Sequence, residues 1–156
     1  MRMSKIVRFG ADVLFGAIVI FGLYIIMHGH LTPGGGFQGG AVVATGVALV
    51  IVAYSYEEVI GMVKKFVLTI QESAGLVMFA GVALIAIGLG TTFFFNFLAN
   101  SGSLFGMTVP FGPNSGELNT GGVLPLMNIA VGIEVWGGLA IIILYMLSGI
   151  GKTEEA

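Results

Sequence analysis

The chain has 156 residues, of which 56% are hydrophobic and only 9% are charged, and its mean hydropathy is +1.03. Because a soluble domain carries about 25% charged residues, this composition is that of a membrane protein. The small net charge of −2 argues against a nucleic-acid-binding surface, and the absence of cysteine excludes disulfides and thiolate metal sites.

Four apolar runs are long enough to cross a lipid bilayer, which takes about 20 helical residues. We therefore expect an all-α polytopic membrane protein, a single integral domain over residues 1–156 with about four transmembrane helices. The first run follows a basic stretch, as in a signal peptide, but no small-residue cleavage pattern closes it, so we expect a retained helix. The predicted spans cover about residues 9–27, 39–56, 74–97 and 123–147.

Two connections between these spans have a distinctive composition. Residues 57–73 mix apolar and charged positions at helical spacing, which predicts a short amphipathic helix at the membrane interface. Residues 99–122 are rich in Gly, Ser, Asn and Pro, which predicts a surface loop. The aromatic cluster at residues 93–97 is expected to end the third span and to anchor it at the interface.

The basic residues indicate the orientation in the membrane, because cytoplasmic segments retain an excess of Lys and Arg. All six fall on one side only if the number of spans is even and both termini are cytoplasmic. We therefore expect a multi-pass protein of the plasma membrane in that orientation. The six are Arg2, Lys5 and Arg8 before the first span, Lys64 and Lys65 after the second, and Lys152 after the fourth.

The connection between the first two spans is unusually rich in glycine. A phosphate-binding loop would need a preceding strand and a Gly-Lys-Ser/Thr ending, and neither is present here. Glycine permits turns at positive φ and lets helices approach closely, so an architectural role is the preferred interpretation. The predicted close-packing motif consists of Pro33, Gly34, Gly35, Gly36, Phe37, Gly39 and Gly40.

Three polar residues near the ends of the first span are secondary candidates. His28 and His30 lie just beyond its end, where they can serve as a pH-sensitive contact or simply cap the helix. Two histidines do not complete a metal site, so no metal and no cofactor is expected. Asp12 lies one turn inside the span, within reach of headgroup water or of Arg8 at i−4.

Glu134 is the strongest candidate for function, because it falls near the middle of the fourth span. An ionisable group at this depth costs several kcal/mol or more unless it is paired, protonated or hydrated. Small residues such as Ala130, Gly137 and Gly138 share its helix face, and no predicted span contains Lys, Arg or His. Three roles remain open: a place on a proton or cation pathway, a structural ion pair with another subunit, or a permanently protonated buried acid.

The run Gly-His-Leu-Thr-Pro-Gly-Gly-Gly-Phe-Gln-Gly-Gly at residues 29–40 closely resembles the signature of the MrpB/MnhB family, which supplies one of the small subunits of Mrp-type multisubunit Na⁺/H⁺ antiporters. The same module is found in archaeal membrane-bound hydrogenase and sulfane reductase complexes. The resemblance implies a small helical subunit of a hetero-oligomeric membrane complex, next to larger antiporter-like subunits that carry the main proton channels. It also implies that any redox cofactor belongs to other subunits.

We therefore expect an accessory subunit of a cation/proton antiport module rather than an enzyme in its own right. The alternatives are a self-assembling small ion transporter or channel, and a purely structural scaffold. Secondary transporters commonly show internal repeats and interrupted spans with several polar groups. No convincing repeat and only one deep acid are found here, which favours partnership with other subunits. The sequence leaves the host complex and the coupling ion open.

Overall fold

The computed structural model describes residues 3–31, 34–109, 111 and 116–150. Helices and irregular connections make up this part of the chain, which contains no strand, so the predicted all-α class is confirmed. The elements are α1 (Lys5–His28), α2 (Gly36–Tyr54), α3 (Tyr56–Met62), α4 (Lys65–Gly88), a 3₁₀ turn (Leu118–Thr120) and α5 (Leu124–Ile150).

Four of these helices, α1, α2, α4 and α5, are long and apolar enough to cross a membrane. The 24 residues of α1 and of α4 give each a length of about 36 Å, which exceeds a hydrocarbon core of about 30 Å. The 19 residues of α2 give about 28 Å, enough to cross with little tilt. The described part of the chain therefore has the four spans expected of a multi-pass membrane protein.

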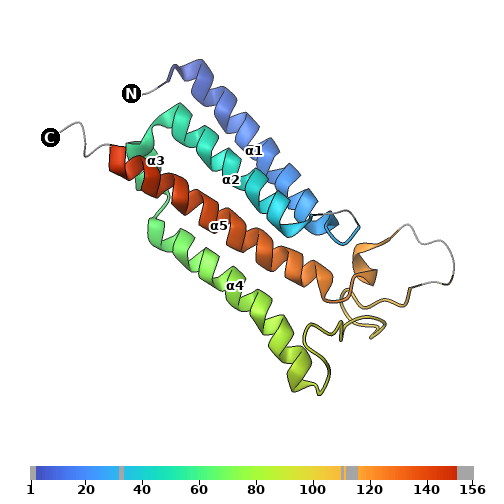
Figure 1. Ribbon diagram of the computed structural model, residues 1–156. Helices are drawn as coiled ribbons and strands as arrows, with labels where there is room; N and C mark the ends of the chain where they lie inside the picture. Colours follow the sequence, from blue (N-terminus) through green and yellow to red (C-terminus); the bar gives the residue numbers. More distant parts are fainter. Residues whose placement is uncertain (1–2, 32–33, 110, 112–115, 151–156) are drawn as a thin grey trace.

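The four long helices lie side by side in one layer, in the spatial order α1, α2, α5, α4 (Figure 1). The last helix of the chain is thus inserted between the second and the third. Near its C-terminal end α1 also reaches α5, where the Ile26 side chain packs on Gly132. Most of α4 and α1 is exposed, as expected for apolar helices whose outer surfaces face lipid or another protein.

Glycines bring the helices of this layer close together. A Cβ on Gly39 of α2 would lie 2.6 Å from the carbonyl oxygen of Gly22 on α1. A Cβ on Gly40 would lie 2.7 Å from the carbonyl oxygen of Gly132 on α5. Inside a bilayer, close van der Waals packing must replace the hydrophobic effect as the main attraction between helices, and small residues permit it.

The third span differs from the prediction, because α4 covers 65–88 rather than 74–97. Charged Lys65 and Glu72 indicated an interfacial segment, yet both belong to the long helix, and only Tyr56–Met62 forms a separate short one. Lys65 lies at the first position of α4, at the membrane edge. The helix ends before Gly90, which has a φ of 75°, so the aromatic cluster at 93–97 follows the span instead of ending it.

Candidate functional site

Glu134 lies near the middle of α5, about 15 Å from its first residue, and it is half-buried. The neighbouring helix α4 passes directly over it at Gly75. A Cβ on Gly75 would lie 2.6 Å from the backbone nitrogen of Glu134 and 2.7 Å from its Cβ. The absence of a side chain at Gly75 therefore brings the two helices together at the level of the carboxylate.

A second carboxylate, that of Glu72 on α4, lies at the same helix contact. A Cβ on Gly138 of α5 would lie 3.5 Å from Oε1 of Glu72, so this side chain passes over Gly138. Gly138 is four residues from Glu134, which places it on the adjacent turn of the same helix face. Two half-buried glutamates thus share the contact between α4 and α5, with Glu134 near the middle of its helix and Glu72 about 10 Å from the start of α4.

We define the α4–α5 seam as this contact and its lining residues. Gly137 completes it, because a Cβ there would lie 2.9 Å from the backbone nitrogen of Glu72 and 2.9 Å from the carbonyl oxygen of Leu68. The missing side chains at Gly75 and Gly137 hold the two helices close. The seam comprises Leu68, Glu72 and Gly75 on α4, and Ala130, Glu134, Gly137 and Gly138 on α5.

The two seam helices contain only one basic residue, Lys65. Its Nζ lies 4.2 Å from the ring centroid of Tyr145, where the aromatic face attracts the cation. Lys65 and Glu72 are seven residues apart, about 10 Å along the helix. The seam helices therefore bring no cation of their own beside Glu134, and its charge must be met by a proton, water, an ion or another subunit.

Sequence reasoning singled out Glu134 as a candidate but did not consider Glu72. The reason is the mistaken start of the third span, which left Glu72 in an interfacial segment just outside the predicted helix. A signal was nevertheless present: Glu72 and Gly75 are one turn apart, as are Glu134 and Gly138. In the seam, each of the two helices contributes one glutamate and a glycine one turn away from it.

His28 and His30 lie at the C-terminal end of α1, away from the seam. The ring of His28 stacks on that of Tyr24 with 5.2 Å between centroids. Nε2 of His30 lies 3.0 Å from the carbonyl oxygen of Glu117, which joins this end of α1 to the connection that precedes α5. Both line a cavity of about 280 Å³ at the end of the helix layer.

Asp12 has a local partner different from the one expected. Its Oδ2 accepts a hydrogen bond of 2.6 Å from the hydroxyl of Tyr54, the last residue of α2. The guanidinium of Arg8 lies over the same aromatic ring, with its carbon 5.6 Å from the centroid. Asp12 therefore belongs to a polar group at the edge of the layer rather than to the seam.

The glycine-rich motif packs within this chain. Gly36 and Gly40 meet α5, Gly39 meets α1, and Gly35 meets Gly29 and Asn128. A larger side chain at Gly36 or Gly39 would therefore collide with this chain's own helices before it affected a partner subunit. Gly34 has a φ of 79° and is exposed, the Phe37 side chain is 63% exposed, and Pro33 lies outside the described residues.

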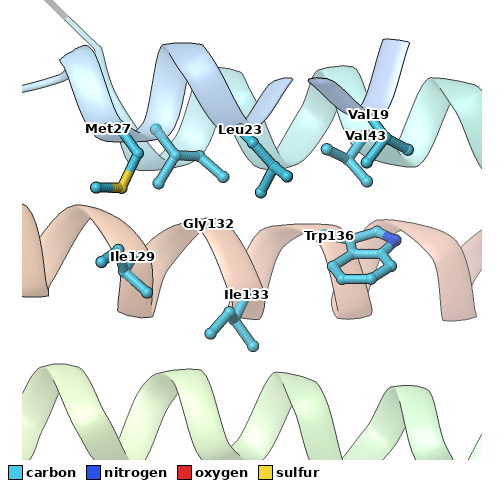
Figure 2. Close-up of a pocket in the computed structure, with 9 residues that line it drawn as sticks. Val19, Leu23, Met27, Val43, Ile129, Gly132, Ile133 and Trp136 are labelled. Carbon is cyan, nitrogen blue, oxygen red and sulfur yellow. The ribbon is translucent and has the colours of Figure 1, made fainter. Parts of the chain in front are cut away.

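A larger cavity, of about 390 Å³, lies where α1 approaches α5 across α2 (Figure 2). Figure 2 shows Met27 of α1 on the side of Ile129 of α5, with Val19 and Val43 opposite Trp136. No ionisable side chain lines it, so this cavity offers a cation no ligand. The lining residues are Val19, Leu23, Ile26, Met27, Val43, Ile129, Gly132, Ile133 and Trp136.

Fold and site together define a small polytopic helical membrane protein with two half-buried carboxylates at one contact between its spanning helices. Residues 6–141 match the family model described as a domain related to the MnhB subunit of Na⁺/H⁺ antiporter, and the chain belongs to this family. It is also 31% identical over 137 residues to an uncharacterized protein of Methanocaldococcus jannaschii. That match covers 88% of this chain and 50% of the relative, so the chain spans about half the relative's length.

Proposed function

We propose that this chain is an accessory membrane subunit of a multisubunit Na⁺/H⁺ antiport module, and that Glu134 lies beside a hydrated cation pathway where the chain meets a neighbouring subunit. The family match supports a role in an antiporter-type complex. The observation that carries the site assignment is the α4–α5 seam. There Glu134 and Glu72 share one helix contact, and neither seam helix supplies an adjacent cation.

The physical argument follows from the cost of charge in a membrane. A carboxylate in hydrocarbon is stable only when it is protonated, hydrated or paired with a cation. Burial favours the protonated form, and a nearby cation favours the ionised form. A carboxyl group that is partly buried and also accessible to a cation can exchange a proton for Na⁺. This exchange is the elementary step that an antiporter requires.

Substitution of the two glutamates tests the proposal. Glu134→Gln keeps the shape of the side chain but removes its titration, whereas Glu134→Asp keeps the charge and shortens its reach. We expect the Gln variant to assemble with its partner subunits and to lose Na⁺-dependent proton movement in vesicles, while Asp retains part of it. Glu72→Gln should also reduce transport. The matched control is Glu57→Gln, which removes an exposed carboxylate on α3 and should leave transport unchanged.

Two outcomes would contradict the pathway. If Glu134→Gln prevents recovery of the complex, the carboxylate is a structural partner for a buried cation of another subunit, because leaving that cation uncompensated costs about 3–5 kcal/mol. If Glu134→Gln assembles and transports normally, Glu134 has neither role. Recovery of the complex and proton movement must therefore be measured on the same preparations.

The host complex is the second part of the proposal. We infer that larger antiporter-like subunits, which carry the main proton channels, are its neighbours in the plasma membrane. A respiratory complex of the hydrogenase type is included among the hosts, with redox chemistry confined to other subunits. Purification in mild detergent, followed by identification of the co-purifying chains, distinguishes these hosts. Recovery of the chain alone, as a homo-oligomer, would instead support a self-assembling channel.

A further inference from the structure

A second polar pocket lies at the end of the layer where α1 begins and α2 ends. It has a volume of about 260 Å³ and is lined by Lys5, Arg8, Phe9, Asp12 and Tyr54. Lys5 and Arg8 are in the first turn of α1, and α1 is a few ångströms longer than a hydrocarbon core. The mouth of this pocket therefore lies at the level of the lipid headgroups.

The Arg8 side chain has a defined contact, but one of its hydrogen-bond donors has no acceptor. Its guanidinium carbon lies 5.6 Å from the centroid of the Tyr54 ring, within the range of a cation–π interaction. Its Nε is buried and has no hydrogen-bond partner among the residues that the structure describes. A buried donor left unpaired costs about 1–3 kcal/mol, so a movement of the Arg8 side chain toward an acceptor in the pocket would recover that free energy.

The side chains that line the pocket carry a positive balance of charge, with Glu58 of α3 as a further anion close enough to act on Tyr54. Its lining contains two cations, Lys5 and Arg8, and one anion, Asp12. The Tyr54 hydroxyl donates a 2.6 Å hydrogen bond to Oδ2 of Asp12, which satisfies part of this carboxylate and ties it to α2. The basic side chains are therefore the groups that remain to meet a ligand, and an anion is the ligand that complements them.

We propose that this pocket binds the phosphate group of an anionic phospholipid. A guanidinium presents planar donors that match phosphate oxygens, and a lysine adds a flexible point charge. Phe9, which is 71% exposed beside these groups, offers an apolar surface to the acyl part of the lipid. The depth of the pocket favours a lipid as the source of the phosphate, since this is the plane in which headgroup phosphates lie.

The test measures lipid binding to the full chain in detergent micelles. Short-chain phosphatidylglycerol, phosphatidylcholine and inorganic phosphate are titrated separately, and binding is followed by native mass spectrometry and calorimetry. We expect Arg8→Gln to weaken phosphatidylglycerol binding about tenfold, which corresponds to about 1.4 kcal/mol. Lys64→Gln removes an exposed charge at the same end of the layer but outside the pocket, and it should change binding less than twofold.

Asp12→Asn provides a gain of binding that loss of structure cannot mimic. An asparagine oxygen still accepts the Tyr54 hydrogen bond, while the negative charge is gone, so phosphatidylglycerol should bind several-fold more tightly. Equal losses in Arg8→Gln and Lys64→Gln would show diffuse attraction and overturn the pocket. So would unchanged or weaker binding in Asp12→Asn. Inorganic phosphate binding as tightly as phosphatidylglycerol would overturn the lipid as the source, and equal binding of phosphatidylcholine would overturn the preference for an anionic lipid.

Discussion

Replacing Gly75 with alanine is expected to push α4 away from α5 at the level of Glu134. The new Cβ would lie 2.6 Å from the carbonyl oxygen of Ala130 and 2.6 Å from the backbone nitrogen of Glu134. This is about 1 Å short of an ordinary van der Waals contact. Because both nearest atoms belong to the backbone, no side-chain rotation relieves the clash, and the helices must separate.

Gly81 on the same helix provides a matched control. A Cβ on Gly81 meets nothing within 4 Å, so Gly81→Ala adds the same methyl group without a steric conflict. Alanine is favoured over glycine in a helix by about 0.5–1 kcal/mol, and both variants gain this term. It cancels in their comparison. The remaining difference is the cost of overpacking, about 1–3 kcal/mol, so Gly75→Ala should be less stable than Gly81→Ala by that amount.

The measurement is the free energy of unfolding in mixed detergent micelles, obtained by titration with a denaturing detergent. Helix content follows the transition, and the fluorescence of the single tryptophan, Trp136, reports on α5. Na⁺-dependent proton movement by the assembled complex is measured in parallel, because separation of the seam should impair it as well. Equal stability of Gly75→Ala and Gly81→Ala would refute the close contact between α4 and Glu134.

Three further predictions test the orientation and the polar contacts. Single cysteines at exposed Leu31 and Lys64 should react with an impermeant reagent from opposite sides of the membrane, with Lys64 on the cytoplasmic side, and labelling from one side would refute the topology. Tyr54→Phe removes the hydrogen bond to Asp12 and should lower the free energy of unfolding by about 1 kcal/mol, measured by the same titration; an unchanged value would show that the bond contributes nothing. Gly138→Ala places a methyl group 3.5 Å from Oε1 of Glu72, which is an ordinary contact. The methyl group displaces water or an ion from that side of the carboxylate, so transport should fall, while the free energy of unfolding should rise by about 0.5–1 kcal/mol because alanine is favoured over glycine in a helix; normal transport would exclude Glu72 from the pathway.

Much of the fold follows from hydrophobic run length, because a membrane demands long apolar helices with internally satisfied backbone groups. The third span was displaced because Lys65 and Glu72 lowered the local hydropathy. In the structure Lys65 is accommodated at the helix end and Glu72 beside glycine. Hydropathy measures the cost of a charge in lipid, and it does not register a charge that is sheltered by a neighbouring helix.

The candidate site was only half predictable for a related reason. The depth of Glu134 follows from its position along one helix, which the sequence shows directly. Its neighbour Glu72 depends on which helices are adjacent, and the spatial order α1, α2, α5, α4 differs from the chain order. The composition of the glycine-rich motif also predicted close packing. The helices that the motif contacts, α1 and α5, depend on the tertiary arrangement and could not be read from the sequence.

The layered arrangement itself favours a role within a larger assembly. Helices in a single row cover one another only along their contacting edges, so a carboxylate at the α4–α5 seam is sheltered by two helices and remains half-buried. At membrane depth the uncovered part would face hydrocarbon, where an ionised group costs several kcal/mol. A second layer of protein, or water held by it, removes that cost. We therefore expect the charges of Glu134 and Glu72 to be stabilised where this chain meets a neighbouring one, as the proposed pathway requires.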